Sequence, residues 1–269
     1  MKTTWKHFPT GENGFFRAPI LVTGPREAVL IDGGFTLPDG RAVAEAIKAT
    51  GKTLTTVYVS QSDPDYYFSL GPIKTAYPDA KILAAPAVVA AIRSTMQKKL
   101  EIWGPKLGTN GPQSVADLSL PEASDARSLT VDGDTIQIID AQGLANRRYL
   151  WLPSLGAVFG GVLVFSGVHV WTADTQTPAQ RAAWLATLGE ITARKPAIVV
   201  PGHMAPTAAT DASAVAYTRG YLVAFEEELA KAADSAALVA AMTRRYPDAG
   251  MGVALDIGAK VATGEMTWG

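Results

Sequence analysis

Residues 54–67 read LTTVYVSQSDPDYY, an apolar run that passes directly into a polar loop. The uninterrupted run 54–59 predicts a strand buried on both faces, as in a parallel sheet. Residues 197–203, AIVVPGH, repeat this arrangement with a core strand that ends in Pro-Gly-His. Because α/β proteins place function at the carboxyl ends of their strands, both loops are candidate functional segments. The side chains of interest in them are Gln61, Asp63, Asp65, Tyr66 and His203.

Strands and helices alternate around these two segments. Residues 28–32 predict a buried strand closed by Gly33-Gly34, and a helix follows over about 41–49. This alternation predicts parallel βαβ units with right-handed crossovers. The Gly- and Pro-rich stretch 104–127 indicates an excursion on the surface. The other predicted elements are a strand at 81–84, a helix at 87–100, hairpins at 129–139 and 148–165, a helix opened by Thr177, and helices from about 215 and over 236–245.

Composition limits the classes of protein that the chain can belong to. Of its 269 residues, 48% are apolar and only 18% charged, which is typical of a globular domain and not of a disordered one. A net charge of -1 gives no general attraction to nucleic acid or to an anionic membrane. The absence of cysteine excludes disulfides and thiolate chemistry. With no apolar core after Met1–Lys6 and no membrane-length apolar run, we expect a soluble, cytoplasmic protein.

Five short motifs lie along the chain: Ile31-Asp32-Gly33-Gly34, the loop 61–66, Gly143-Leu144, Gly161-Val162 and Pro201-Gly202-His203. Together they resemble the metallo-β-lactamase superfamily. The resemblance runs from about Phe15 to His203 and implies an α/β fold, a four-layer αββα sandwich. It implies one domain over residues 1–269, of which about 211–269 form a C-terminal helical extension. Members of that family hold two metal ions on the loops at the sheet edge.

Most of the metal ligands that the resemblance implies are replaced in this chain. Of the seven ligand positions, only Asp65 and His203 keep the residue type of the family. Gln61, Asp63 and Tyr66 stand where the family has three histidines. Leu144 replaces a fourth histidine, and Val162 replaces the aspartate that bridges the two metal ions. Two divalent ions held side by side repel each other and need a bridging anionic ligand, which valine cannot supply. The resemblance therefore argues against a binuclear zinc centre.

A single metal ion and no metal at all both stay open at this point. One divalent ion could lie between Asp63, Asp65 and His203. An oxygen-rich ligand set of this kind favours Mn, Fe or Mg over Zn. Alternatively, Asp-Pro-Asp is a common turn that caps a short helix through a carboxylate.

Two further residues are candidates for the same cleft. His169, in Gly-Val-His-Val-Trp, could act there as an acid, a base or a substitute ligand, or it could pack against Trp171. Trp171, together with Leu144 and Val162, would make the pocket more apolar and suited to a small molecule.

The function implied by the resemblance is hydrolysis of a small ester, lactone or amide-like substrate. In that hypothesis Asp65 and His203 position or deprotonate the attacking water, with Asp63 beside them, and Tyr66 donates to the oxyanion. One alternative is a catalytically inactive member that binds a small ligand or a partner protein. Another is a metal-independent lyase or isomerase that uses Asp63, Asp65 and His203. The sequence does not indicate an oligomeric state.

Overall fold

The first half of the chain forms a six-stranded sheet in a computed structural model that describes residues 2–268. The strands lie in the order β1-β2-β3-β4-β5-β6; the first three are antiparallel, and β3 to β6 are parallel. The parallel part confirms the predicted βαβ units. The strands are β1 (Thr4–His7), β2 (Ile20–Thr23), β3 (Glu27–Ile31), β4 (Thr53–Val59), β5 (Lys81–Ala84) and β6 (Glu122–Ala123). Their helices are α1 (Leu37–Thr50), α2 (Leu70–Ala76) and α3 (Pro86–Leu107).

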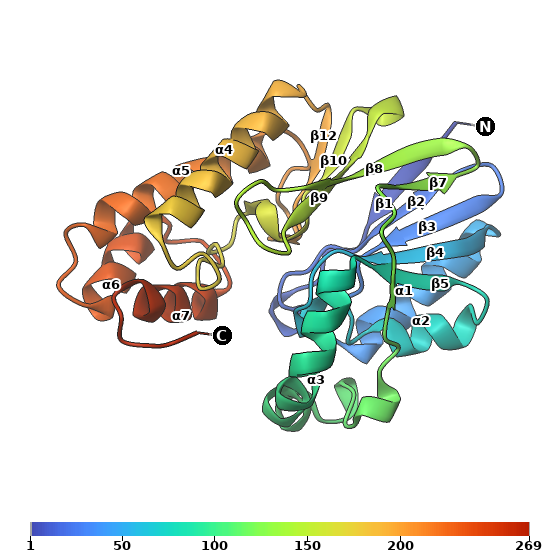
Figure 1. Cartoon of the computed structure of the whole chain (residues 1–269), viewed down its shortest axis with the longest axis horizontal. Helices are drawn as coiled ribbons and strands as arrows, with labels where there is room; N and C mark the ends of the chain where they lie inside the picture. The colour runs from blue at the N-terminus through green and yellow to red at the C-terminus, as the bar shows by residue number, and fades with distance from the viewer. Residues whose placement is uncertain (1, 269) are drawn as a thin grey trace.

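The second half contributes a five-stranded sheet in the order β12-β10-β9-β8-β7 and a small parallel pair, β11-β13. The strands of the larger sheet are β7 (Ser128–Val131), β8 (Asp134–Asp140), β9 (Arg148–Leu152), β10 (Ala157–Phe159) and β12 (Ile198–Val200). The pair consists of β11 (Phe165–Ser166) and β13 (His203–Met204). The helices are α4 (Pro178–Ala193), α5 (Ser213–Leu229), α6 (Ser235–Arg245) and α7 (Gly252–Ala262), and Figure 1 shows them gathered at one end of the molecule.

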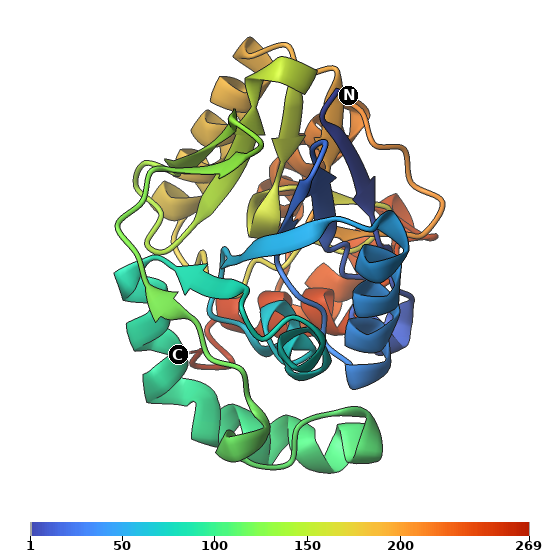
Figure 2. The same cartoon turned by 90° about the vertical axis from the view of Figure 1, so that its right-hand side faces the viewer.

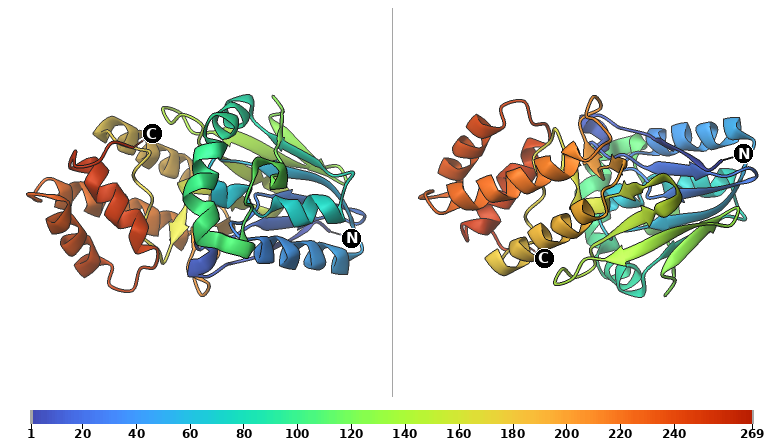
Figure 3. Two further views of the ribbon diagram at one scale, coloured as in Figure 1. Left: turned by 90° about the horizontal axis from the view of Figure 1, so that it is seen from below. Right: turned by 90° about the horizontal axis from the view of Figure 1, so that it is seen from above.

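The two sheets pack face to face, with helices outside them (Figures 2 and 3). Strand β3 shows why. Its alternating side chains point to opposite faces, so Val29 and Ile31 join the core between the sheets, whereas Ala28 and Leu30 join the core under the helices. This arrangement confirms the αββα sandwich. Within residues 2–268, every helix is too short or too polar to cross a membrane.

The structure differs from the sequence prediction in the following two segments. The predicted strand 157–165 is interrupted after β10, because Gly161 adopts a left-handed conformation (φ 49°) and starts a 3-10 turn. Helix α3 continues through Pro105 to Leu107, beyond its predicted end at 100. Within the expected C-terminal helical extension, α7 follows residue 250, and Leu255 of that helix is part of the main core. The 3-10 turns are η1 (Glu12–Gly14), η2 (Pro64–Tyr66), η3 (Gly108–Asn110), η4 (Val115–Asp117), η5 (Pro153–Leu155) and η6 (Gly161–Leu163).

Candidate functional site

Asp32 ties the ends of β3 and β4 together. It follows β3 in the left-handed conformation (φ 61°), and its carboxylate accepts hydrogen bonds from the Ser60 amide at 2.7 Å and the Ser60 hydroxyl at 2.9 Å. These bonds fix where the loop 60–67 leaves the sheet. Asp63 then precedes the single turn η2, but its side chain makes no capping bond to that turn and pairs with Lys99 instead.

Arg17 is buried between the two loops singled out by the sequence, and its side chain is 0% exposed. Its Nε donates to the carbonyl oxygen of Asp65 at 3.1 Å, and its Nη1 donates to that of Gly202 at 2.5 Å. The guanidinium lies 3.3 Å from Asp32 Oδ2 and 3.6 Å from Asp65 Oδ2, and its central carbon is 3.4 Å from the centre of the Tyr66 ring. One side chain thus connects both loops. The Arg17 cluster is defined here as Arg17, Asp32, Asp65, Tyr66 and His203.

His203, in β13, completes the Arg17 cluster. Its Nδ1 donates to the carbonyl oxygen of Phe15 at 2.8 Å, and its Nε2 lies 3.4 Å from Tyr66 Oη and 3.4 Å from Asp65 Oδ2. The Phe165 ring stacks parallel to the imidazole, with centres 5.1 Å apart. The imidazole is therefore held on both edges and one face.

Burial decides the charge states within the cluster. It lowers the pKa of His203 well below 6.5, and the nearby Arg17 charge lowers this pKa further, so the imidazole is neutral at pH 7. Since Nδ1 carries the proton given to Phe15, Nε2 accepts from the Tyr66 hydroxyl. Burial also raises the pKa of Asp65 to about 7, against the opposing Arg17 charge.

Asp65→Asn is expected to change how stability depends on pH. A carboxyl whose pKa is raised on folding binds a proton more tightly in the folded state, so its contribution to stability is present below the unfolded pKa and lost as pH rises to the folded one. Between pH 4 and 7 the wild-type chain should therefore lose up to about 4 kcal/mol relative to Asp65→Asn. Urea unfolding of both proteins across this range measures the difference.

Asp65→Ala is the control for this experiment. It removes the same titrating carboxyl without adding an amide, so the same pH trend should appear at a lower overall stability. A difference between wild type and Asp65→Asn that is equal at all pH values would contradict the raised pKa of Asp65.

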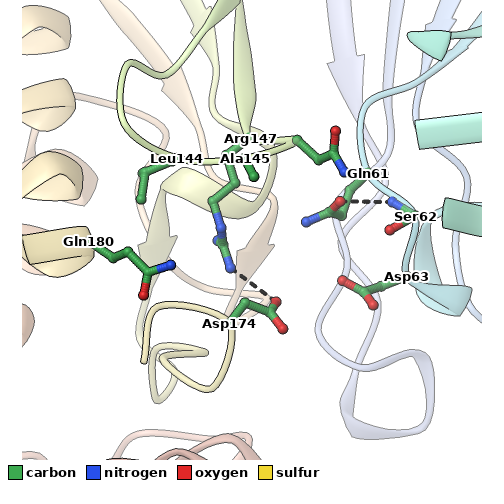
Figure 4. A pocket seen from close by; sticks show the side chains of 9 residues that line it. Gln61, Ser62, Asp63, Leu144, Ala145, Arg147, Asp174 and Gln180 are labelled. Atoms are coloured by element: carbon green, nitrogen blue, oxygen red, sulfur yellow. Dashed lines mark hydrogen bonds and ion pairs between the residues drawn. The ribbon is translucent and has the colours of Figure 1, made fainter. Parts of the chain in front are cut away.

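A pocket of about 170 Å³ opens between the loop after β4 and the segment between β8 and β9 (Figure 4). Its remaining wall is formed by Asp174, which precedes α4, and by Gln180, which lies in the first turn of α4. Polar groups dominate this lining. The polar pocket is defined by Gln61, Ser62, Asp63, Leu144, Ala145, Asn146, Arg147, Asp174 and Gln180.

An ion pair between Arg147 and Asp174 lies in the polar pocket (Figure 4). Arg147 Nη2 is 3.0 Å from Asp174 Oδ2, and Nη1 donates to the Val162 carbonyl at 3.2 Å. The guanidinium also lies 5.1 Å from the ring centre of the buried Trp184. The other carboxylate oxygen of Asp174 accepts from the Trp268 indole at 2.7 Å. Both members of the pair are therefore oriented by contacts outside the pocket.

The negative charge of Asp63 acts on Asp174 across the polar pocket. Burial raises the pKa of Asp174, the negative charge of Asp63 raises it further, and Arg147 opposes both effects. Asp63 itself is 2.8 Å from Lys99 Nζ. A carboxyl with a raised pKa beside a guanidinium is an arrangement suited to proton transfer.

The structure divides the predicted site residues between these two places. One group lines the polar pocket: Gln61, Asp63 and Leu144. The other group lies in the buried Arg17 cluster: Asp65, Tyr66 and His203, at 8%, 1% and 3% exposure. The loops that carry both groups meet as the sequence indicated, but the imidazole and its partners lie outside the pocket lining.

The three remaining candidates contact the site indirectly or not at all. The Val162 side chain is buried, and only its carbonyl reaches Arg147. Trp171 packs edge-on against Trp268, the indole that bonds to the pocket carboxylate. His169 lies apart, with Nδ1 2.9 Å from the Tyr221 hydroxyl of α5.

Sequence reasoning missed Arg17, Arg147 and Asp174. Arg147 and Asp174 sit in loops without a recognisable motif. Arg17 stands within the otherwise apolar run 15–20, and this was a usable signal, because an arginine there must find buried partners. Its partners are remote in sequence, so the signal would predict burial without identifying them.

The residues present do not fit a metal ion. Within residues 2–268, no group of three or more His, Asp or Glu side chains is placed to hold one. The predicted single-metal set of Asp63, Asp65 and His203 is therefore wrong as a coordination group: Asp63 pairs with Lys99, and the Arg17 guanidinium lies beside Asp65. A divalent cation there would be repelled by that fixed positive charge.

Comparisons with known proteins agree with this fold. The sequence model of the metallo-β-lactamase superfamily matches residues 14–203, and the chain belongs to that superfamily. A β-lactamase domain protein from Burkholderia ambifaria is similar in structure, with a TM-score of 0.67 and 17% identity over 97% of this chain and 84% of that one. A metallo-β-lactamase family protein from Thermus thermophilus gives a TM-score of 0.64 and 14% identity over 97% and 91%. No curated protein matched the sequence.

Proposed function

We propose that this chain is a metal-independent hydrolase that takes a small polar ester, lactone or amide-like substrate into the polar pocket. The observation that carries the proposal is the Arg147–Asp174 pair, which lies in a pocket lined by three of the family's ligand positions, Gln61, Asp63 and Leu144. The pocket therefore occupies the place where the resemblance puts the reaction. It is polar and small, which favours a substrate with several hydrogen-bonding groups.

The pocket residues supply the two groups that hydrolysis needs. Asp174, with its raised pKa, takes the proton from the attacking water, and Arg147 stabilises the oxyanion that forms on the substrate. Asp65 and His203 cannot act on a substrate from their buried positions, so in this proposal they support the loops. The role predicted for Tyr66 at the oxyanion passes to Arg147 for the same reason.

A second candidate is an inactive member that binds a small ligand in the same pocket. The burial of Asp65, Tyr66 and His203 favours it, because these side chains occupy three ligand positions of the family without facing the pocket. Asp63 and Asp174 would also serve a metal-independent lyase or isomerase, which product analysis distinguishes from a hydrolase.

Turnover of a panel of small esters, lactones and β-lactams tests the proposal. We expect Asp174→Asn to lower kcat by about 10²–10⁴-fold, since a positioned general base contributes that much. Arg147→Gln should lower kcat to a similar extent, and EDTA should leave the wild-type rate unchanged. The measurements are initial rates and product identity by mass spectrometry.

Arg245→Gln is the matched control, because Arg245 also pairs with carboxylates, Glu227 and Glu228, but on the surface of α5 and α6. Its activity should equal that of the wild type. Full activity of Asp174→Asn, or loss of activity with EDTA, would overturn the proposal. Ligand-induced thermal stabilisation without any product would favour the inactive, binding member.

A further inference from the structure

The Arg17 guanidinium lies among positions that, by the resemblance, would bind metal. Its central carbon is 3.4 Å from the centre of the Tyr66 ring, and its Nε is 3.6 Å from the Asp65 carboxylate. Its Nη1 donates to Gly202, the residue before His203. Three of the seven ligand positions of the family, Asp65, Tyr66 and His203, thus surround or adjoin a planar organic cation.

The contacts of Arg17 use both its charge and its shape. Asp32 and Asp65 give it two carboxylates, at 3.3 and 3.6 Å, and two main-chain carbonyls accept from the guanidinium. The flat face of the group stacks on Tyr66, a geometry that an ammonium ion cannot reproduce. Within the described residues Nη2 and Asp65 Oδ2 make ion-pair contacts but no hydrogen bond, so charge carries part of this interaction.

We infer that the Arg17 guanidinium replaces the metal ion of the superfamily as a built-in cation, which holds the end of β3, the turn η2 and the loop before β13 together. A metal ion in this position would link the same loops through Asp65 and His203. The arginine does so permanently, from a segment that precedes β2. This inference concerns how the site is held together and is independent of the reaction proposed for the polar pocket.

Removing the side chain should leave a cavity specific for guanidinium ions. Arg17→Ala deletes the equivalent of N-ethylguanidinium, and the carboxylates of Asp32 and Asp65 then have no cationic partner. Millimolar N-ethylguanidinium should raise the Tm of this variant by about 2–4 °C once the ligand exceeds its Kd about tenfold. Ethylammonium, which has the charge without the planar fork, should raise it less.

Arg148→Ala is the matched control. Arg148 is also a buried arginine, at 5% exposure of its side chain, and it pairs with Asp140 at 3.2 Å in the second sheet. Its variant should lose stability without being rescued in the same way, because Arg148 faces one carboxylate and does not stack on Tyr66. Adding N-ethylguanidinium, zinc or EDTA should leave the Tm of the wild type unchanged.

The pKa of the His203 imidazole provides a second readout, because the Arg17 charge and burial both lower it. Loss of Arg17 should raise the pKa of His203, measured by NMR titration, and N-ethylguanidinium should lower it again. If Arg17→Ala does not fold alone, its refolding yield with and without N-ethylguanidinium and the Tm of Arg17→Lys replace these measurements.

Rescue confined to Arg17→Ala, or a refolding yield that depends on N-ethylguanidinium, supports the inference. It is overturned if N-ethylguanidinium rescues both alanine variants equally or neither, if Arg17→Lys is as stable as the wild type, or if EDTA lowers the wild-type Tm.

Discussion

Asp32→Ala is expected to destabilise the fold by about 3–5 kcal/mol, the usual cost of removing one partner from a buried ion pair. The carboxylate lies 3.3 Å from the Arg17 guanidinium and also accepts two bonds from Ser60. Without it, the buried Arg17 charge loses the nearer of its two carboxylate partners, and the two Ser60 donors lose their acceptor. Chemical unfolding at pH 7 measures the loss, which should exceed that of any single surface ion pair.

Asp32→Asn separates the two roles of this carboxylate. An amide keeps one acceptor oxygen for the Ser60 donors but gives up the charge that faces Arg17. We expect the stability of Asp32→Asn to lie between that of the wild type and that of Asp32→Ala. Equal stability of Asp32→Asn and wild type would show that Arg17 does not depend on the Asp32 charge, and an unchanged Asp32→Ala would contradict the geometry of the whole cluster.

The sequence was informative about the sheets because burial imposes strong patterns on strands. The run at 28–32 is buried, the run at 54–59 is buried except for the half-buried Thr55 and Thr56, and each corresponds to a strand of the parallel part. The helix opened by Thr177 is present with its reciprocal capping bonds to Gln180. Such patterns are local, and a single sequence displays them directly.

The site was only partly predictable, because its decisive contacts join remote segments. The loops of Asp65 and His203 were expected from the ends of two strands, and these side chains approach to 3.4 Å. Arg17, which contacts both loops, is 48 and 186 residues away from these side chains in sequence and belongs to no motif. Within the C-terminal helical extension, the bounds of α7 were not predicted either, since this helix is held by tertiary packing against the core.

The character of the polar pocket was also not predictable from the sequence. Replacing metal ligands by Leu144 and Val162 suggested a more apolar cleft. The structure instead buries Val162 and places Arg147 and Asp174 in the lining of the polar pocket. Which side chains line such a pocket depends on loop geometry, and this geometry is not encoded in a local pattern.

Gly202→Ala is expected to lower stability by about 3 kcal/mol or more, the upper range for overpacking a rigid site. A Cβ at this position would lie 2.0 Å from the carbonyl oxygen of Gly161 and 3.0 Å from Arg17 Nη1. The first contact is with backbone, which cannot rotate away as a side chain could. One of the two loops must therefore move.

Gly189→Ala is the control that fixes the sign of this effect. Gly189 lies within α4, where an added Cβ meets nothing within 4 Å, so this change should stabilise the protein by about 1 kcal/mol through helix propensity.

Displacing Gly202 moves the acceptor of Arg17, and displacing Gly161 moves the neighbouring Val162 carbonyl that orients Arg147. Gly202→Ala should therefore weaken ligand binding in the polar pocket and also lower the stability of the fold. Thermal unfolding with and without a pocket ligand measures both effects. A Gly202→Ala protein as stable as Gly189→Ala would contradict the close approach of Gly202 to the Gly161 carbonyl.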